Sequence, residues 1–252
     1  MAEKKDRKYI LQSVENALSI LDLLCEHQEL SVNEVAKYMG LGKSTAFRLL
    51  TTLCYKNFVV KDDKAYYSLS VKFAGIWKII SDRSMLIQQI HPFLVNLSAK
   101  TGETSHLVIW NSDSEIIFID KVIAPATIRM DSMVGLTRLA HTTGTGKVLL
   151  ANSTQLFINQ YLSTTPFIKM TPYTISSKET LLSELENVRQ QGYSCDNEES
   201  EVGLTCFSVP IFSMNKAIAA ISTSGPTHRM NTKKEMLIQS LKSIAKNIEI
   251  SI

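Results

Sequence analysis

The stretch that most constrains the fold runs from Gly40 to Leu53, where apolar residues recur as they do on one face of a helix. The spacing i, i+3, i+4 and i+7 predicts a helix with one buried face. The apolar positions are Ala46, Leu49, Leu50 and Leu53. The side chains left on the outward face are Ser44, Arg48, Thr51 and Tyr55.

A shorter helix is predicted immediately before this one. Ser31 and Glu34 form a Ser-x-x-Glu capping box, which marks a helix start, and Gly40 is a residue type that often ends a helix. Two helices joined by a turn of about four residues are typical of a helix-turn-helix, whose second helix enters the major groove of DNA.

The polar residues of the second helix suit contacts with DNA. Ser44, Thr45 and the first backbone amides can donate to phosphate oxygens, and Lys43 adds a positive charge beside them. Arg48 can reach a guanine edge in the major groove. Thr51 lies on the same predicted face.

Two β-prone runs follow the helix, at residues 57–61 and 65–69. The Asp-Asp-Lys turn between them predicts a hairpin, and a hairpin directly after a recognition helix is the wing of a winged helix-turn-helix. Lys61, Lys64 and Tyr66 are then expected to contact the flanking DNA backbone. A bare helical module that binds protein is the alternative interpretation.

The positive charge of the chain is concentrated in its N-terminal third. The 252 residues carry a net charge of +3, and residues 1–83 hold 13 Lys and Arg against 10 Asp and Glu, whereas residues 84–252 hold 14 of each. This distribution is expected if the N-terminal part meets a polyanion. Residues 1–8 are expected to form a mobile basic arm.

The four cysteines lie far apart and include no Cys-x-x-Cys pair. The sequence shows no zinc-ligand spacing, no signal peptide and no apolar run long enough to span a bilayer. We therefore expect a cytoplasmic protein with reduced thiols and no metal, cofactor or membrane partner. Cys25 and Cys54 lie in helical patterns and are expected to be buried.

The domain layout follows from these patterns. Residues 9–70 are predicted to form the winged helix-turn-helix domain, residues 71–83 a linker helix whose Trp77 and Ile80 can pack against a second copy, and residues 84–252 a second domain. The first helix is predicted to pack through Val14, Ala17, Leu18, Leu21 and Leu24.

In the second domain the apolar period changes from helical to two at Glu103. The predicted strands are 106–110, 115–122, 127–130, 192–196, 207–212 and 217–224. The predicted helices lie near 146–151 and 155–162, at 178–191 after a Ser176/Glu179 capping box, and at 233–248 after Thr232/Glu235. Hairpins combined with intervening helices predict an α+β or mixed α/β sensor-like domain.

Gly144-Thr145-Gly146 is a candidate anion cradle, because glycines let backbone N–H groups approach a ligand at a helix start. A nucleotide-binding P-loop is disfavoured, since the glycine spacing is too short and Val148 replaces the required Ser or Thr. Three residues nearby in sequence can bind an acidic ligand or lie on the surface: Arg129, Arg138 and His141.

Together these motifs resemble the isocitrate lyase regulator (IclR) family of bacterial transcription factors, from about Val14 to Ile248. The motifs are LGKSTAFRLLTTL at 41–53, TGETSHL at 101–107, HTTGTGKVLLA at 141–151, TPYTI at 171–175, QGYSCDNEESEVGLTCFSVPI at 191–211 and ISTSGP at 221–226. The resemblance implies a winged-helix domain, a dimerising linker helix and a GAF-like C-terminal domain that binds a small metabolite, often a carboxylate.

The resemblance also implies which residues form the effector pocket: Gly144, Thr145, Asp196, Cys206, Ser222 and Ser224. From the residues alone, Ser222 and Ser224 would be exposed strand positions and Cys206 a core residue. Thr145 stands where the family usually has a small apolar residue, which adds a hydroxyl beside the ligand.

The sequence therefore predicts a homodimer, or dimer of dimers, that binds double-stranded operator DNA as a repressor under the control of a small carboxylate. Two other classes stay open. One is an enzyme with Cys206 as nucleophile and His106 or His141 as base, although no motif that activates the thiol is present. The other is a winged-helix adaptor that binds protein.

Overall fold

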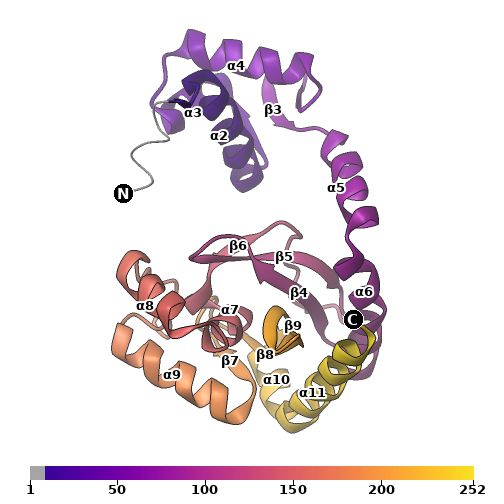
Figure 1. Cartoon of the computed structure of the whole chain (residues 1–252). Coiled ribbons are helices and arrows are strands. Elements are labelled where there is room, and N and C mark those ends of the chain that lie inside the picture. The colour runs from indigo at the N-terminus through magenta and orange to yellow at the C-terminus, as the bar shows by residue number, and fades with distance from the viewer. Residues whose placement is uncertain (1–8) are drawn as a thin grey trace. The chain divides into compact units, whose positions relative to one another are not determined.

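The chain divides into two compact units, Met1–Arg83 and Ser84–Ile252. The computed structural model describes residues 9–252, apart from the side chains of residues 81–83, and Figure 1 shows its elements. The basic arm expected for residues 1–8 lies outside the described residues. Of the helices described, none is long and apolar enough to cross a membrane.

The first unit is a helical domain with a small antiparallel sheet whose strand order is β1-β3-β2. Its core contains Ile20, Leu24, Val35, Leu50 and Tyr67. Its elements are α2 (Gln12–His27), β1 (Glu29–Ser31), α3 (Val32–Met39), α4 (Lys43–Tyr55), β2 (Val59–Lys61), β3 (Tyr66–Leu69) and α5 (Lys72–Arg83).

The helix-turn-helix forms as its capping residues predict. The Ser31 hydroxyl accepts a hydrogen bond from the Glu34 amide at 3.4 Å, and the Ser31 amide donates to the Glu34 carboxylate at 2.8 Å. Gly40 ends α3 in the left-handed conformation, with φ of +62°. The reciprocal cap and the glycine fix where α3 begins and ends, and α4 begins three residues after Gly40.

The wing is the hairpin of β2 and β3. Its turn is held by the Asp62 carboxylate, which accepts hydrogen bonds from the Lys64 amide at 3.0 Å and the Tyr66 amide at 2.7 Å. A third strand, β1, pairs with β3 from Glu29 to Ser31 and was not expected from the sequence.

Two expectations for α2 are wrong. Val14 and Leu18 are 51% and 57% exposed, whereas Leu24 is buried and Ala17 and Leu21 pack against the core as predicted, together with Ile20. Cys25 is also exposed, because it follows Leu24 around the helix and points away from the core. Apolar residues lie on two sides of α2, so periodicity alone identified only part of the buried side.

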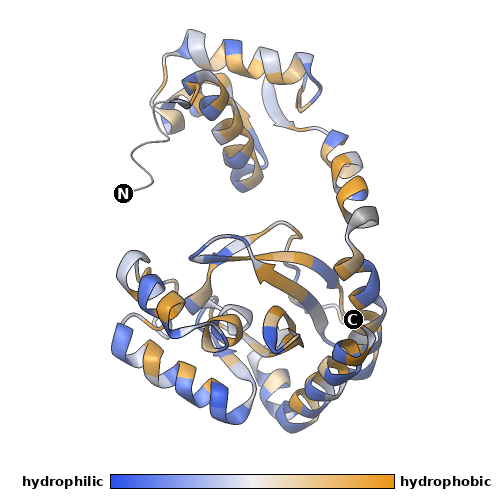
Figure 2. Ribbon diagram, in the orientation of Figure 1, coloured by the Kyte–Doolittle hydropathy of each residue, from blue (hydrophilic) through white to orange (hydrophobic). Residues whose placement is uncertain are grey.

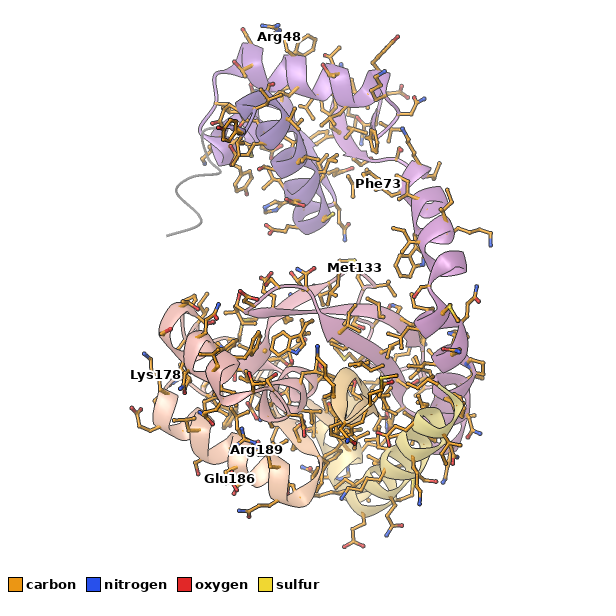
Figure 3. The ribbon with its side chains drawn as sticks, in the orientation of Figure 1. Arg48, Phe73, Met133, Lys178, Glu186 and Arg189 are labelled. Atoms are coloured by element: carbon orange, nitrogen blue, oxygen red, sulfur yellow. The ribbon has the colours of Figure 1, made fainter. Side chains whose placement is uncertain are left out.

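The start of helix α5 packs against Phe58, next to the wing, through Lys72 and Phe73. The Lys72 ammonium lies 3.8 Å from the centre of the Phe58 ring, and that ring is 5.5 Å from Phe73. Figure 3 labels Phe73 at the start of this helix. Farther along, Trp77 and Ile80 are 36% and 52% exposed.

The second unit is built on an antiparallel sheet with the strand order β6-β5-β4-β9-β8-β7 in the described chain. The strands are β4 (Thr104–Trp110), β5 (Glu115–Val122), β6 (Thr137–Leu139), β7 (Ser194–Asn197), β8 (Leu204–Ser213) and β9 (Lys216–Pro226). Neighbouring residues alternate between its faces, as Leu107 and Val108 do when they enter different cores.

Helices cover both faces of this sheet (Figure 1). One core contains residues of α6 (Met85–Thr101) and α11 (Lys234–Ser251). The other contains residues of α7 (Gly144–Ala151), α8 (Gln155–Thr164) and α9 (Lys178–Gln191). Hydrophobic and hydrophilic stretches alternate along these helices in Figure 2, as expected for amphipathic helices. The predicted α+β class is confirmed.

The strand predicted at 127–130 is wrong, since this segment is irregular and the edge strand is β6. Its carbonyl groups are bound by side chains instead of a neighbouring strand. The Thr104 hydroxyl donates to Met130 O at 2.9 Å, and the Arg229 guanidinium donates to Ile128 O at 3.0 Å.

Two helix starts also differ from the sequence prediction. Helix α9 is capped by Ser177, whose hydroxyl accepts from the Thr180 amide at 3.1 Å, so Ser176 is not the cap. Thr232 does not cap α11, because it ends the short helix α10 (Thr227–Thr232) and its hydroxyl donates to His228 O at 2.9 Å.

Candidate functional site

The first candidate surface is the outward face of α4. Lys43, Ser44, Thr45, Arg48 and Thr51 are all exposed. Figure 3 shows Arg48 pointing away from the core of its unit. The face therefore presents two cations and three hydroxyl groups, although the Thr51 hydroxyl donates to Phe47 O at 2.8 Å and is partly used within the helix.

The start of α4 leaves backbone donors available. Its N-cap residue is Gly42, which has no side chain to accept a hydrogen bond, and the amides of Thr45 and Ala46 turn back to Gly42 O. The first amides of a helix otherwise lack acceptors within the helix, and they carry the positive end of its dipole. This arrangement suits phosphate oxygens.

The wing residues Lys61, Lys64 and Tyr66 are exposed as well. The Lys61 ammonium lies 5.7 Å from the centre of the Tyr67 ring, within the first unit. The hairpin thus carries two cations and a phenol beside the helix-turn-helix.

The second candidate site is a cavity of about 70 Å³ in the second unit. It is lined by all six residues that the family resemblance implied, although they come from α7, β7, β8 and β9: Gly144, Thr145, Asp196, Cys206, Ser222 and Ser224. The rest of the lining is His106, Phe118, Met130, Leu136, Arg138, Thr143, Ser200, Glu201 and Leu204.

Strand register explains why these polar residues meet. Asp196 lies opposite Cys206, and Cys206 lies opposite Ser224. Ser222 lies opposite His106 on β4. Side chains opposite one another across a sheet point to the same face, so one face presents the whole polar group.

The two glycines of α7 allow close packing at the start of this helix, and Gly144 also lines the cavity. A Cβ on Gly146 would lie 2.2 Å from Ala140 O, and one on Gly144 would lie 2.8 Å from the Ser208 hydroxyl. The start of α7 can therefore lie close to its neighbours. Thr143 caps the helix, because its hydroxyl accepts from the Gly146 amide at 3.0 Å.

Asp196 organises the turn that borders the cavity. Its carboxylate accepts hydrogen bonds from the Glu199 amide at 2.8 Å, the Ser200 amide at 3.3 Å and the Ser200 hydroxyl at 2.5 Å. Burial raises the pKa of this carboxyl group. A buried carboxyl lining a cavity favours a ligand that can donate hydrogen bonds.

His106 is a cavity residue that the sequence suggested only as a catalytic base. Its Nδ1 lies 3.3 Å from the Ser222 hydroxyl, and its buried Nε2 has no hydrogen-bond partner in the described structure. Burial, aided by the charge of Lys121, lowers the pKa of His106 to about 3, so the ring is neutral at neutral pH. Only the pairing of β4 with β9 could have indicated this role.

Cys206 does not have the properties of a nucleophile. Its Sγ lies 3.4 Å from the Ser208 hydroxyl, and burial raises the pKa of the thiol to about 12. The thiol is therefore protonated at neutral pH, whereas nucleophilic cysteines are thiolates.

The three nearby basic residues take different positions. Arg138 lines the cavity, and Arg129 lines the wider depression beside it. His141 lies on neither the cavity wall nor the surface: it is fully buried, its Nδ1 is 2.7 Å from the Tyr161 hydroxyl, and burial lowers its pKa to about 4.

Arg138 is the cavity residue with an unused charge. Its Nη1 donates to Thr137 O at 3.0 Å, and in the described part of the chain no carboxylate lies within 4.0 Å of its guanidinium. A partly buried guanidinium without a carboxylate partner is suited to bind an anion.

Comparisons with known proteins match both units. The family model described as "Bacterial transcriptional regulator IclR C-terminal" matches residues 80–250, and the one described as "IclR helix-turn-helix domain" matches residues 13–63. The HTH-type transcriptional regulator KdgR of Dickeya chrysanthemi is 36% identical over 241 residues, which cover 94% of this chain and 79% of that protein.

Two further similarities are informative. The transcriptional repressor IclR of Escherichia coli K12 is 31% identical over 224 residues, covering 87% of this chain and 82% of the repressor. The crystal structure of an IclR homologue from Microbacterium hydrocarbonoxydans, complexed with 4-hydroxybenzoate, matches with a TM-score of 0.72 at 21% identity, covering 88% of this chain and 90% of that one. At that identity the structural match shows the fold alone.

Proposed function

This chain belongs to the IclR family of bacterial transcriptional regulators, and we propose that it is a cytoplasmic repressor whose affinity for operator DNA is controlled by a small carboxylate in the cavity of its second unit. It is a DNA-binding regulator and not an enzyme. The E. coli relative named a repressor supports the proposed direction of control.

One observation supports the proposed ligand. The six residues that the family resemblance implies for the effector pocket come from four elements and line one cavity, and Arg138, which has no carboxylate partner among the described residues, lines it with them. A buried polar wall of this kind is costly unless its groups find partners. A bound carboxylate supplies acceptors for Arg138 and for the first amides of α7. The IclR homologue from Microbacterium hydrocarbonoxydans, which shares this fold, was crystallised with 4-hydroxybenzoate, itself a carboxylate.

The DNA half assigns roles along α4. Arg48 reads a base edge in the major groove, and Lys43, Ser44, Thr45 and Thr51 contact phosphates. Lys61, Lys64 and Tyr66 of the wing contact the flanking backbone. These roles are supported by the exposure of all eight side chains.

The proposed assembly is a homodimer or a dimer of dimers, in which the exposed apolar residues of α5, Trp77 and Ile80, pack against a second copy. A dimer of helix-turn-helix domains reads two half-sites about 34–36 Å apart, or a multiple of that distance. Binding of the ligand then changes operator affinity by a coupling free energy of about 1–3 kcal/mol.

A comparison of Arg48→Ala with Lys43→Ala tests the assigned DNA contacts. On a site selected by the wild-type protein from random-sequence DNA, we expect Arg48→Ala to weaken binding by about 1–3 kcal/mol, with little effect on a scrambled duplex. Lys43→Ala should weaken both duplexes and lower the salt slope by about one. Fluorescence anisotropy over a range of salt concentrations measures both quantities.

Lys178→Ala is the matched control, because it removes an exposed cation at the start of α9 in the other unit (Figure 3). It should leave binding to both duplexes unchanged. Equal losses on both duplexes for Arg48→Ala would show that Arg48 does not read sequence. Failure of the wild-type protein to select any DNA would favour the adaptor interpretation of the winged domain.

A further inference from the structure

We propose that Phe47 reads a thymine of the operator by packing its ring against the 5-methyl group of that base in the major groove. This inference rests on the proposed function, since it adds a second sequence-reading residue to the helix that carries Arg48. It also predicts that each half-site holds a thymine at a fixed distance from the base that Arg48 reads.

Phe47 is a large apolar residue that the first unit leaves half exposed. It is 49% exposed, and in the described chain it belongs neither to the core of this unit nor to the partly buried residues packed against that core. Its ring has no aromatic or cationic partner among the described residues. The packing of the first unit therefore does not explain a phenyl group at this position.

Phe47 lies among the residues that are proposed to contact DNA. Residues three and four positions apart are neighbours on the surface of a helix. Lys43 and Ser44 precede Phe47 at these spacings. Thr51 follows it by four residues and donates its hydroxyl to Phe47 O at 2.8 Å. Of the exposed side chains described on α4, that of Phe47 alone has no polar atom, so the polar face of the helix contains one apolar position.

The dimensions of the major groove bring this position to the bases. An α-helix with its side chains is about 10–12 Å across and the major groove of B-DNA is about 12 Å wide, so a recognition helix fills the groove. Residues near the start of such a helix contact the base edges. Phe47 and Arg48 are the fifth and sixth residues of α4. A placement that brings Arg48 to a base edge therefore brings Phe47 into the groove as well.

The chemistry of the phenyl ring selects the base. Thymine alone presents a methyl group in the major groove, whereas the other base edges there are marked by hydrogen-bond donors and acceptors. A ring packed over those polar atoms would displace water without replacing its hydrogen bonds, which costs free energy. A ring packed on the methyl group removes apolar surface of both groups from water. Thymine is therefore the base that Phe47 favours.

The test compares thymine with uracil, which lacks only the 5-methyl group. The full-length wild-type protein first selects a site from random-sequence DNA, and uracil then replaces thymine at one position of the site at a time. Fluorescence anisotropy measures the dissociation constant of each duplex. At one position we expect uracil to weaken binding about 4-fold for each half-site that carries it. This factor corresponds to about 0.8 kcal/mol for one buried methylene-sized group, since about 1.4 kcal/mol is tenfold.

Variants of the protein assign the methyl contact to the ring. Phe47→Ala should bind the thymine and uracil duplexes equally at that position. Phe47→Leu keeps an apolar side chain and should retain part of the preference for thymine. Tyr55→Ala is the matched control, because it removes an exposed aromatic ring farther along the same helix, and it should retain the full preference. The melting temperature of each variant without DNA checks that it is folded.

Two results would overturn the inference. One is that uracil is bound as tightly as thymine at every position of the selected site. The other is that Phe47→Ala keeps the wild-type preference for thymine; a change in its oligomeric state by analytical ultracentrifugation would then assign Phe47 to a protein interface. In both cases the proposed function stands, provided that the wild-type protein selects a site through Arg48. If the wild-type protein selects no DNA, the proposed function and this inference fail together.

Discussion

Lys147 shows how a single buried charge is held in the second unit. Its side chain is 1% exposed, and its ammonium lies 2.6 Å from Glu199, 3.1 Å from Glu184 and 2.6 Å from Cys195 O. Although burial disfavours the charge, the two carboxylates raise the pKa of Lys147. Glu199 follows Asp196 in the turn that borders the cavity, so this ion pair also holds that turn against α7.

We expect Lys147→Met to lower the free energy of unfolding by about 3–5 kcal/mol, because it leaves the buried carboxylate of Glu199 without its cation. Urea unfolding at pH 7.5 measures the loss. Lys178→Met is the control, since it removes an exposed lysine and should change stability by about 0.5 kcal/mol or less. A loss below about 1 kcal/mol for Lys147→Met would contradict this account.

His106 predicts a dependence of stability on pH. Its pKa falls from 6.5 to about 3 on folding, mainly through burial. Below about pH 6.5 the unfolded chain takes up a proton at this residue and the folded chain does not, so stability falls as the pH falls. Between pH 7.5 and pH 5 the contribution lost is about 2 kcal/mol.

The measurement compares the wild-type protein with His106→Gln by urea unfolding at pH 7.5, 6 and 5. Other titrating groups, including His141, are present in both proteins and largely cancel in the difference. The variant should gain stability relative to the wild type as the pH falls. A difference that is the same at all three pH values would show that His106 takes up its proton in the folded protein.

At the scale of elements, packing explains why α7 begins with Gly-Thr-Gly. We expect Gly146→Ala to destabilise the second unit by about 1–3 kcal/mol or more, because its methyl group would meet the backbone of Ala140 at 2.2 Å. Thermal unfolding monitored by circular dichroism measures the change.

Gly75→Ala is the same exchange at an open position of α5, where no atom lies within 4 Å of the added carbon. It should be neutral or stabilising, because alanine favours a helix over glycine by about 1 kcal/mol. If Gly146→Ala proved as harmless as Gly75→Ala, the close contact between α7 and Ala140 would be wrong.

The helices and strands that carry a local sequence signal, such as a capping box or a long β-prone run, could be predicted from the sequence. The capping box at Ser31, the glycine at the end of α3 and the long β-prone run of β5 each specify structure locally. The three-residue strands β1 and β6 have no detectable period and depend on their partners in the sheet. Residues 127–130 likewise depend on distant parts of the chain, since the side chains of Thr104 and Arg229 donate hydrogen bonds to their carbonyl groups.

The lining of the cavity could also be predicted only in part. The family resemblance indicated Asp196, Cys206 and Ser224, but the strand pairings that bring them together could not be derived from spacing. The residues His106 and Arg138 enter the site through the pairing of β4 with β9 and the position of β6 at the sheet edge. The sequence left Arg138 open between binding an acidic ligand and lying on the surface, and it suggested His106 only as a catalytic base.

At the scale of the whole molecule, the chain joins a DNA-binding unit and a ligand-binding unit at Arg83 and Ser84. Each has its own core, so each can be disturbed separately by the variants above. What makes the chain a regulator is the coupling between the two binding events. By linkage, a ligand that alters DNA affinity must bind with a correspondingly different affinity when DNA is present.

The most direct test is the dissociation constant for the selected DNA site, measured by fluorescence anisotropy with and without a saturating concentration of the best-binding acid. The account predicts a change of about 5- to 150-fold in the wild-type protein, with weaker binding in the presence of the acid, and no change in Arg138→Leu at that concentration. An unchanged dissociation constant for wild-type protein shown by calorimetry to be saturated with the acid would contradict it.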